Sequence, residues 1–470
     1  MEAIPEGLSA FSPPPALRRV LAGLRGAGYE AFLVGGAVRD LACGAPSGAL
    51  EFDLATDAHP DRVAALFGRV VDTGISHGTV TVVEDGQAFE VTTYRGRRPE
   101  RGAPLPRDVG TMEEDLSKRD FTINAMAYDP MDRRLLDLHG GRRDLAAGVV
   151  RAVGDPDERF AEDPLRTMRA CRFAARFGFR VDRATRRAIP RHLEAFRDVA
   201  VERIQGELSK ILVSAHPRYG IELLRGTGLL RVILPELLEG LGMRQNRWHR
   251  YDVYHHVLHA VQAARPDLVV RLATLLHDVS KPATAAPSDK APGEFTFYSH
   301  EVDGARRARE IGERLRFPAK VIDEVALLVR EHQFVYTDEW SDAAVRRMLA
   351  RVGEERFDAL LAVREADIRG RGIAVEEGLE NLAALERRVA ALRSERPALR
   401  IRDLALDGRD VMRILGLGPS PLVGEALQHL LGEVLESPEA NTPESLEARL
   451  RAWWRDRSSA EDEDPRNQDR

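Results

Sequence analysis

The sequence is poor in cysteine and contains no long apolar run. Its 470 residues include only two cysteines, Cys43 and Cys171, which excludes a disulfide framework and a cysteine-rich zinc site. No stretch approaches the ~18 uninterrupted apolar residues of a membrane helix, and even Leu268–Leu276 contains Arg271. The first residues lack the basic segment and apolar core of a secretory signal. We therefore expect a soluble, cytoplasmic protein that works in a reducing compartment and does not enter a membrane.

Neither sign of charge dominates the chain. Lys and Arg number 69 against 75 Asp and Glu, for a formal net charge of −6. This excludes a protein coated in positive charge, but it leaves room for a local basic face that binds a polyanion. Apolar residues make up 43% and charged residues 31%, so the chain can bury real cores. A length of 470 residues exceeds one compact core and suits several domains.

The patterning predicts an α+β fold, with a mixed sheet near the N-terminus and helices in the rest of the chain. The β-rich runs Thr79–Val83 and Ala88–Tyr94 flank Asp85 and Gly86, which predicts a hairpin in an at least partly antiparallel sheet. From about Arg159 onward, helical periodicity dominates and strand signals almost disappear. No internal repeat of fixed period is present.

Composition divides the chain into six segments. The first is rich in proline up to residue 16, where we expect a loose lead-in, and continues as a helix over Leu17–Gly26. The six are an N-terminal extension and helix (1–27), a mixed α/β head (28–150), a helical neck and body (151–248), a histidine-rich helical domain (249–370), a last helical region (371–455) and a disordered acidic tail (456–470).

Acidic side chains occur in two of the expected strands of the head. In a strand over Leu50–Leu54, successive side chains would point to opposite faces, which places Glu51 and Asp53 on one face. Glu90 lies in the second strand of the hairpin, where polar and apolar side chains alternate in the same way. If the hairpin strand lies beside the first, three carboxylates converge and can hold Mg²⁺ ions for phosphoryl transfer. The alternative is that these acids are solvated on the face of a strand.

A double glycine follows the first strand of the head. Gly35 and Gly36 separate Leu33-Val34 from an expected helix that contains Arg39. Glycine lets the backbone approach a phosphate closely, a helix start offers N–H groups, and an arginine adds a forked donor. The three residues are therefore candidate ligands of a triphosphate, although a double glycine also occurs in ordinary tight turns.

The double glycine and the acid pair begin a series of five motifs. These are Gly35–Asp40 (GGAVRD), Glu51–Thr56 (EFDLAT), Glu114–Ala125 (EDLSKRDFTINA), Arg159–Arg166 (RFAEDPLR) and Glu202–Glu207 (ERIQGE). In this order they resemble the class II CCA-adding tRNA nucleotidyltransferase and bacterial poly(A) polymerase family, a branch of the polymerase-β-like nucleotidyltransferases. The resemblance implies a polymerase-β-like head that precedes an elongated helical neck, body and tail.

The resemblance implies a catalytic role for the acids of the head. Glu51 and Asp53 become the Mg²⁺ ligands, with Glu90 as the third catalytic acid. The family usually has Asp where Glu51 stands, so the carboxylate lies roughly one ångström further out, and Mg²⁺ tolerates poor geometry badly. Arg119 is implied to hold the incoming nucleotide, and Lys118 stands where an arginine is common. Surface pairing with neighbouring acids is the alternative for these two basic residues.

The fourth motif leads into an expected helix that carries basic residues at intervals of three. Asp163 suits its N-terminal cap, and Arg166, Arg169 and Arg172 follow. An acceptor and a forked donor about one turn apart can address the Watson–Crick edge of a base. By resemblance, Asp163 and Arg166 select CTP or ATP without a template, and the other two arginines support them and the phosphates. The alternative is a salt-bridged helix face.

Histidines and acids recur in the fourth segment. They are His256, His277, Asp278, His300, His332 and Asp367. Mixed imidazole and carboxylate ligands suit Ni²⁺, Mn²⁺, Fe²⁺ or Zn²⁺ better than Mg²⁺. The spacing resembles the HD phosphohydrolase superfamily, whose metal ligands would be His256, His277, Asp278, His332 and Asp367. The domain is expected either to act as a phosphatase or cyclic phosphodiesterase on RNA ends, or to keep only the fold.

The last helical region resembles the part of the family that contacts tRNA. It contains Arg402–Asp410 and a glycine-rich break at Gly416–Pro419, which offers N–H groups to phosphates or forms a helix–turn–helix without a ligand. No basic and aromatic stacking platform is evident. We therefore expect the RNA to be recognised by its shape and backbone.

The resemblance implies an enzyme that adds CCA to tRNA 3′ ends from CTP and ATP. A CC-adding enzyme, an A-adding enzyme and a poly(A) polymerase share its motifs. In the family a loop at this place governs the change from C to A, and the stretch 96–112 is somewhat shorter than expected for it, so a CC-adding enzyme stays an alternative. The replacement at Glu51 supports a further alternative, an HD phosphohydrolase whose N-terminal half grips RNA. The sequence sets no oligomeric state.

Overall fold

The computed structural model describes residues 4–46, 48, 50–74, 78–94, 109–289, 291–292, 294–395 and 397–462. Two compact units divide the chain, Met1–Pro235 and Glu236–Arg470. The boundary between the units falls inside the predicted neck and body segment (151–248), and the six predicted boundaries themselves remain predictions. An N-terminal mixed sheet followed by helices confirms the predicted α+β class.

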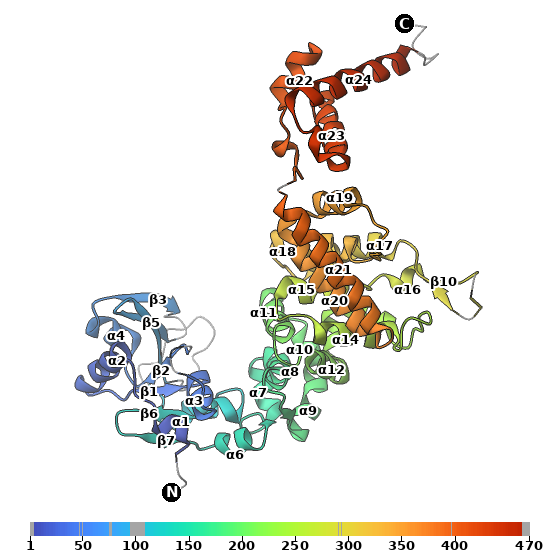
Figure 1. Cartoon of the computed structure of the whole chain (residues 1–470). Helices are drawn as coiled ribbons and strands as arrows, with labels where there is room; N and C mark the ends of the chain where they lie inside the picture. The colour runs from blue at the N-terminus through green and yellow to red at the C-terminus, as the bar shows by residue number, and fades with distance from the viewer. Residues whose placement is uncertain are drawn as a thin grey trace. The chain divides into compact units, whose positions relative to one another are not determined.

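The first unit contains the sheet and the helices that surround it (Figure 1). Its helices are α1 (Glu6–Ser9), α2 (Pro15–Gly26), α3 (Gly36–Ala42), α4 (Pro60–Leu66), α5 (Met112–Ser117), η3 (Thr122–Asn124), α6 (Gly141–Ala146), α7 (Pro156–Glu162), α8 (Leu165–Phe177), α9 (Arg183–Ala188), η4 (Ile189–His192), α10 (Leu193–Phe196), α11 (Val201–Leu212), α12 (Pro217–Thr227) and α13 (Leu229–Ile233). Its strands are β1 (Phe32–Val34), β2 (Asp53–Thr56), β3 (Val70–Gly74), β4 (Thr79–Glu84), β5 (Gln87–Thr93), β6 (Ala127–Asp129), β7 (Arg134–Leu136), β8 (Val149–Val150) and β9 (Arg180–Val181).

A seven-stranded mixed sheet organises the head. Its strand order is β3-β4-β5-β2-β1-β6-β7. β4 and β5 form the predicted hairpin, and β2 pairs with β5 in parallel, whereas the other neighbours are antiparallel. The parallel register sets Asp53 opposite Glu90, so strands from two different parts of the sequence bring acidic side chains to one face of the sheet.

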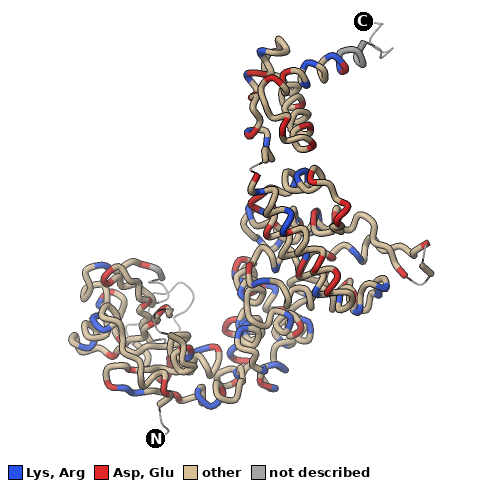
Figure 2. Tube along the Cα trace, in the orientation of Figure 1, with Lys and Arg blue, Asp and Glu red and all other residues tan. Residues whose placement is uncertain are grey.

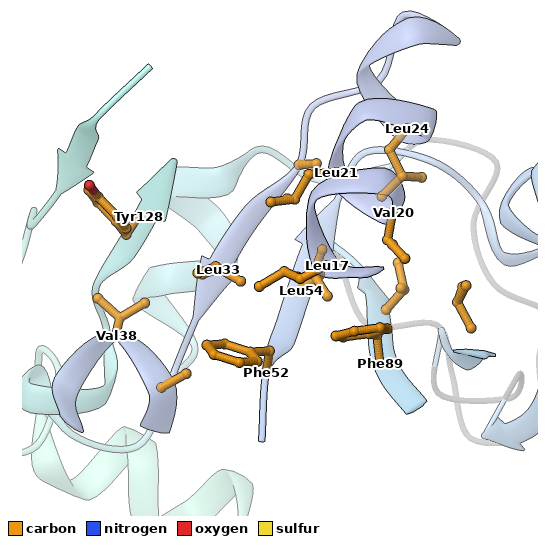
Figure 3. Close-up of a cluster of buried hydrophobic side chains, with 14 of the residues drawn as sticks. Leu17, Val20, Leu21, Leu24, Leu33, Val38, Phe52, Leu54, Phe89 and Tyr128 are labelled. Atoms are coloured by element: carbon orange, nitrogen blue, oxygen red, sulfur yellow. The ribbon is translucent and has the colours of Figure 1, made fainter. Parts of the chain in front are cut away.

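Helix α2 covers the opposite face of the sheet. Leu17, Val20, Leu21 and Leu24 recur at helical spacing and are fully buried. Figure 3 shows that they point toward apolar side chains of the strands, among them Leu54. The buried faces of helix and sheet leave the acidic face of β2 and β5 free for chemistry.

The N-terminal lead-in is ordered in the part that the structure describes. Residues 4–14 contain helix α1, and the side chains of Leu8 and Phe11 belong to the core of the head. The hydroxyl of Tyr128 donates a hydrogen bond to the carbonyl of Leu8. The prediction of a loose segment was wrong there because two apolar side chains among the prolines find a place in the core.

The strand predicted over Leu50–Leu54 begins later and runs from Asp53 to Thr56. Its antiparallel partner β1 ends at Val34, which faces Asp53, and the chain then turns at Gly35. Residues 51 and 52 thus have no partner on β1. Glu51 consequently precedes the strand, and its position is set by the loop rather than by strand alternation.

The second unit is mainly helical, apart from one short hairpin. Its elements are η5 (Pro235–Gly240), α14 (Val253–Ala263), α15 (Leu268–Leu276), α16 (Lys281–Thr284), β10 (Ala286–Pro287), β11 (Phe295–Thr296), α17 (His300–Arg314), α18 (Ala319–Glu331), α19 (Asp342–Val352), α20 (Glu354–Arg371), α21 (Val375–Ser394), η6 (Ile401–Asp403), α22 (Gly408–Leu415), α23 (Pro421–Glu436), η7 (Pro438–Ala440) and α24 (Pro443–Asp462). Within the described ranges, none of the helices has the length and apolar content needed to cross a bilayer. Figure 2 shows Lys and Arg interspersed with Asp and Glu along the helices of both units.

The acidic tail is helical over its first residues. Helix α24 continues to Asp462, so the prediction of disorder from residue 456 was wrong for residues 456–462, and residues 463–470 lie outside the described part. Leu446 and Leu450 are fully buried against α22 and α23. Once this packing has formed the first turns, each added residue extends the helix at little cost.

The packing of α2 on the sheet makes the Leu54 side chain a stability determinant of the head. Leu54→Ala should lower the free energy of unfolding by about 2–5 kcal/mol, since a cavity replaces a fully buried side chain. Scanning calorimetry measures the change. Leu66→Ala is the matched control because that side chain is 40% exposed; an equal loss in both variants would contradict this account of the core.

Candidate active site

A cavity of about 570 Å³ opens beside the acidic face of the sheet in the first unit. It is lined by Gly35, Gly36, Arg39, Glu51, Asp53, Arg119, Asp120, Asn124, Asp163, Arg166, Arg169, Arg172, Phe173, Arg176, Arg203 and Lys210. All eight residues predicted to bind the nucleotide are among them, together with two of the three predicted acids. The structure thus gathers the separate motifs around one space.

Three carboxylates meet at the edge of this cavity. Glu90 faces Asp53 across the β2–β5 pair but is not part of the cavity lining. Protein atoms around the Asp53 carboxyl remove much of its water, although the group opens into the cavity. This burial, with the charges of Glu90 and Glu51, raises the pKa of Asp53 to about 6 against the opposing effect of Arg119. These carboxylates repel one another, and their oxygen atoms are the ligands that a hard divalent cation prefers. The donor set therefore fits such a cation.

The double glycine lets the backbone turn close to the acids. Gly35 has a φ of +70°, which side-chain-bearing residues rarely adopt. A Cβ atom there would lie 3.2 Å from Nη1 of Arg119 and 3.7 Å from Oδ2 of Asp53. Nε and Nη2 of Arg119 both donate to Asp115 Oδ2, at 3.0 and 2.9 Å. The buried Asp115 carboxylate therefore holds the Arg119 guanidinium beside the turn.

Arg39 is buried in the wall of the cavity. Its guanidinium donates two hydrogen bonds to Asp40 and one to Asn124 Oδ1. It also lies over the rings of Phe177 and Phe173, at 4.8 and 5.3 Å from their centres. These contacts commit the side chain mainly to positioning helix α3 against helix α8, and a direct contact of Arg39 with phosphate stays a prediction.

The residues predicted to read the base lie where helices α7 and α8 meet. Asp163 accepts the N–H of Leu165 through Oδ1 and a hydrogen bond from Arg203 Nη2 through Oδ2, at 2.7 Å. Arg166 donates to Glu162 at 2.8 Å and to the carbonyl of Lys118 at 2.9 Å. The predicted pair therefore exists on the cavity wall, held by ion pairs on both sides.

The other two predicted arginines of α8, Arg169 and Arg172, make ion pairs with buried carboxylates. Arg169 donates through Nε and Nη2 to Asp120 Oδ2, at 2.9 and 2.6 Å. Arg172 lies 2.6 Å from Glu207 on helix α11, and burial lowers the pKa of its guanidinium to about 10. These residues join α8 to the head and to α11, which agrees with the supporting role implied for them.

Sequence reasoning missed several residues of the cavity. Asp120 and Asn124 lie in the third motif, and Asn124 donates a 3.0 Å hydrogen bond to Asp120. The spacing of four residues between Asp120 and Asn124 was the sequence signal that could have indicated this contact. Arg203 lies in the fifth motif, whereas Arg176 and Lys210 lie in no motif and reach the cavity only through the folding of α8 and α11.

The cavity is predominantly cationic. Seven arginines and one lysine line it, against four carboxylates. The carboxylates Glu51 and Asp53 lie with the glycines, whereas most of the arginines come from α8 and its neighbours. Acids that are able to bind a divalent metal ion, beside a cationic wall, can hold a triphosphate and position its α-phosphate for transfer.

A second cluster of possible ligands is buried in the other unit. The six residues noted in the sequence come together there: Nε2 of His256 lies 3.1 Å from Nε2 of His277 and 3.3 and 3.2 Å from Asp278 and Asp367. Nε2 atoms of His300 and His332 lie 3.5 and 3.9 Å from Asp278. The predicted set is thus brought together, with His300 as a further member.

The orientation of the imidazoles fits a metal site. Nδ1 of His277, His300 and His332 each lies 2.6–2.7 Å from a backbone carbonyl three residues earlier. A carbonyl only accepts, so Nδ1 carries the hydrogen and Nε2 of the neutral ring keeps its lone pair toward the cluster. Burial lowers the pKa of His332 to about 3, which keeps that ring neutral.

Three segments of the chain match known families. Residues 31–151 match the Poly A polymerase head domain, residues 178–241 the family described as "Probable RNA and SrmB- binding site of polymerase A", and residues 249–381 the HD domain. Together with the acids and the cationic cavity, these matches define a nucleotidyltransferase head in one chain with an HD domain.

Relatives that extend over nearly the whole chain specify the family. The A-adding tRNA nucleotidyltransferase of Deinococcus radiodurans is 36% identical over 436 residues, which cover 90% of this chain and 95% of that protein. The CCA-adding enzyme of Geobacillus thermodenitrificans is 33% identical over 452 residues, covering 93% and 95%. The crystal structure of the Bacillus stearothermophilus CCA-adding enzyme in complex with CTP is 29% identical, with a TM-score of 0.72 and coverage of 95% of this chain and 100% of that chain.

The chain belongs to the tRNA nucleotidyltransferase family that contains these A-adding and CCA-adding enzymes. This confirms the resemblance inferred from the five motifs. The protein is a nucleotidyltransferase, and the family implies that its activity depends on a divalent metal ion.

The ion pair between Asp120 and Arg169 should stabilise the first unit in a pH-dependent way. Burial alone would raise the pKa of Asp120, but Arg169 and the hydrogen bonds from Asn124 and Phe121 lower it to about 2. This pKa lies below that of the unfolded chain, about 4, so the stabilisation is complete above pH ~4 and is lost as the pH falls toward ~2. Asp120→Asn should cost about 2 kcal/mol at pH 7 and progressively less below pH ~4.

Hydrogen exchange of peptides from β1 and α8, measured across a urea series at pH 7 and at pH 3, reports this loss for the first unit alone. Asp157→Asn is the control. Arg191 and His192 lower the pKa of Asp157 to about 2 as well, but the Asp157 carboxyl is far less buried than that of Asp120. Its side chain is 43% exposed, so solvent screens the pair and the loss should be smaller. A pH-independent loss in Asp120→Asn would contradict the ion-pair account.

Proposed function

We propose that the protein adds C, C and A to the 3′ ends of tRNA without a template, using CTP and ATP. The observation that carries the proposal is the convergence of three head acids, a glycine turn and the arginines of α8 around one cavity. Relatives that match nearly the whole chain are named for this reaction or for its last step. The work would take place in the cytoplasm, where tRNA matures, and the free cysteines Cys43 and Cys171 agree with a reducing compartment.

In the proposed reaction, the terminal 3′-hydroxyl of the tRNA attacks the α-phosphate of the nucleotide, and pyrophosphate leaves. Glu51 and Asp53, with Glu90 beside them, would hold Mg²⁺, which lowers the pKa of the attacking hydroxyl and stabilises the leaving group when bound. The Gly35-Gly36 backbone and Arg119 would bind and orient the triphosphate next to these acids. Glu51 supplies the same oxygen ligands as Asp from a longer side chain.

Asp163 and Arg166 would select the base. An aspartate offers acceptors and an arginine offers paired donors, so together they can match the hydrogen-bonding edge of cytosine or adenine. Asp163 now pairs with Arg203, which also lines the cavity, and Arg166 pairs with Glu162 at the end of α7. An incoming base would replace these contacts with its own hydrogen bonds to Asp163 and Arg166. Arg169 and Arg172, fixed by their own ion pairs, would keep α8 in place while the base changes from C to A.

An enzyme that adds only the final A is the second candidate. The A-adding relative of Deinococcus radiodurans covers nearly the whole chain at 36% identity. The loop that the sequence analysis connected with the change from C to A lies mostly outside the described residues, which exclude 95–108. The choice between the candidates therefore depends on the products of the reaction.

The products separate these candidates directly. Four substrates are incubated with CTP and ATP, singly and together, and the new ends are sequenced: tRNA lacking CCA, tRNA-C, tRNA-CC and an unrelated RNA. We expect complete CCA on every tRNA when both nucleotides are present, and no extension of the unrelated RNA. Extension of tRNA-CC alone would identify an A-adding enzyme, arrest after CC a CC-adding enzyme, and A runs on any RNA a poly(A) polymerase.

In the same assay, Asp53→Asn and Glu51→Gln should reduce addition by more than about 100-fold, because changing even an outer partner of a metal ligand costs 10- to 100-fold. Circular dichroism checks that both variants fold. Asp61→Asn is the matched control, since that side chain on α4 is 79% exposed and lies outside the cavity. Full activity of either acid variant would remove the metal assignment at that residue.

The histidine cluster supports a second activity, metal-dependent hydrolysis of phosphate esters. The Asp278 carboxylate is buried beside Lys281, whose Nζ lies 2.7 Å from Oδ2, and the Nε2 atoms of His256, His277 and His300 lie 3.2–3.5 Å from its oxygens. Imidazole and carboxylate ligands favour Ni²⁺ or Mn²⁺ over Mg²⁺. When bound, such an ion supplies an activated water and polarises a phosphate. Terminal or cyclic phosphates of damaged RNA are the proposed substrates.

Removal of one ligand tests this second activity. His277→Ala should lose most of the bound Ni²⁺ or Mn²⁺ and the hydrolysis of RNA with a 2′,3′-cyclic phosphate end. Elemental analysis of the dialysed protein and a phosphate-release assay measure the two effects. His59→Ala, a histidine of the head, is the control and should retain both. A wild-type protein that binds neither metal would leave only a structural role for the cluster.

A further inference from the structure

The cations that line the cavity of the first unit fall into two groups by their exposure. Five arginines expose at most 32% of their side chains: Arg39, Arg119, Arg166, Arg169 and Arg172. Arg176, Arg203 and Lys210 expose 47%, 51% and 60% of theirs. Because these three side chains line the cavity and also reach solvent, they lie at its mouth. A macromolecule that inserts one end into the cavity has to pass them.

Helix α11 carries two of the exposed cations on one side. Arg203 and Lys210 are seven residues apart, so they project from nearly the same side of the helix, about 10 Å apart along its axis. Gly206 is a neighbour of both on the helix surface, three residues after one and four before the other. The helix packs against α8, which carries Arg176. These four residues are named the cationic rim below.

Gly206 leaves the helix backbone bare between the two cations of α11. Glycine weakens a helix relative to alanine because it loses more backbone freedom on folding. Nothing in the packing requires it here, since a Cβ atom would meet no described atom within 4 Å outside its own stretch of helix. A bare stretch of helix lets the backbone of another molecule approach closely. The residue therefore suits a ligand better than it suits the fold.

The charge of Lys210 is only loosely engaged by the protein. Its Nζ lies 3.7 Å from Oε1 of Glu207, beyond hydrogen-bond distance, and the other oxygen of that carboxylate contacts Arg172 at 2.6 Å. The ammonium group ends a flexible side chain that is more than half exposed. It can therefore reach an anion at the mouth of the cavity.

The two exposed arginines are paired, but in ways that a ligand can displace. Arg176 donates to Asp40 at 3.0 Å, and Arg203 donates to Asp163 at 2.7 Å. Solvent screens the ion pairs of half-exposed arginines, so such pairs contribute little to stability. A phosphate offers an arginine the same paired acceptors as a carboxylate, and a base that binds Asp163 would release Arg203.

We propose that the cationic rim binds the sugar–phosphate backbone of the 3′-terminal strand of tRNA. This assignment rests on the proposed function and adds the position of its second substrate, while the less exposed arginines belong to the nucleotide site and its supports. During CCA addition, the strand ends first in the unextended tRNA, then in C and then in CC. Contacts to the backbone do not depend on the base, so one set of cations can hold all three ends.

Binding of tRNA without turnover tests the rim. Labelled tRNA that lacks CCA is titrated with the whole protein in EDTA without nucleotide, and fluorescence anisotropy gives Kd over a series of salt concentrations. Lys210→Gln and Arg176→Gln should each raise Kd about tenfold, the equivalent of one hydrogen bond to a charged group. Each should also reduce the slope of log Kd against log salt by about 0.7–1, since one phosphate contact is lost.

Gly206→Gln separates binding from folding. Glutamine forms helices more readily than glycine, so the thermal unfolding temperature should not fall, yet the new side chain fills the gap between the cations. The Kd for tRNA should rise at least as much as in the two charge variants. Arg197→Gln is the matched control and should bind tRNA normally, because that arginine is 58% exposed, belongs to the same unit and lies outside the cavity lining.

Steady-state kinetics assigns the rim to one of the two substrates. We expect a raised KM for tRNA in the three rim variants and an unchanged KM for CTP and ATP. A raised KM for the nucleotides with normal tRNA binding would place the triphosphate at the rim and overturn the proposal. Unchanged tRNA binding in all three variants, or an equal loss in Arg197→Gln, would overturn it as well.

These outcomes are separate from the identity of the product. An enzyme that adds only the final A would still bind tRNA through the rim, which would disprove the proposed function alone. Addition of CCA by a protein whose rim variants keep normal tRNA affinity would disprove the rim alone.

Discussion

The buried carboxylate of Asp120 is the interaction on which the arrangement of the transfer site depends. One oxygen accepts a hydrogen bond from Asn124, which in turn accepts one from Arg39, and the other binds the guanidinium of Arg169. A carboxylate that is shielded from solvent in this way remains charged only because these donors surround it. Helix α3, which follows the glycine turn, is thereby linked to the arginines of α8, and this links the acids proposed to bind the metal to the residues proposed to read the base.

The second constraint is the parallel pairing of β2 with β5. Every other neighbour in the sheet is antiparallel, and this one pair brings Glu90 beside Asp53 from a separate hairpin. Repulsion between the carboxylates raises the pKa of Asp53, which makes the site costly without a cation and receptive to one. Stability is supplied on the other face of the same strands, where Leu54 and its neighbours pack against α2. One sheet thus separates its structural face from its chemical face.

In the second unit, backbone geometry orients the chemistry. The imidazoles of His277, His300 and His332 are held by backbone carbonyls three residues earlier, so that each presents its unprotonated nitrogen to Asp278. Asp367 of this cluster also accepts hydrogen bonds from Arg364 and Arg371. The HD domain therefore contains a buried set of imidazole and carboxylate groups whose orientation fits a metal ion.

Local patterning was sufficient for the hairpin, for helix α2, for the motifs and for the clustering of histidines, because alternation, turn residues and short spacings are written along the chain. It was insufficient where partners are distant. The start of β2 at Asp53 depends on where β1 ends, and the helical course of residues 456–462 depends on packing of Leu446 and Leu450 far from the charged tail. Arg176 and Lys210 carried no local signal, since only tertiary contacts bring them to the cavity. The sequence by itself determined which chemical groups are available and roughly on which elements they lie. Tertiary structure alone decided which of them share a space, because burial, ion pairing and pKa depend on neighbours that are remote in the chain.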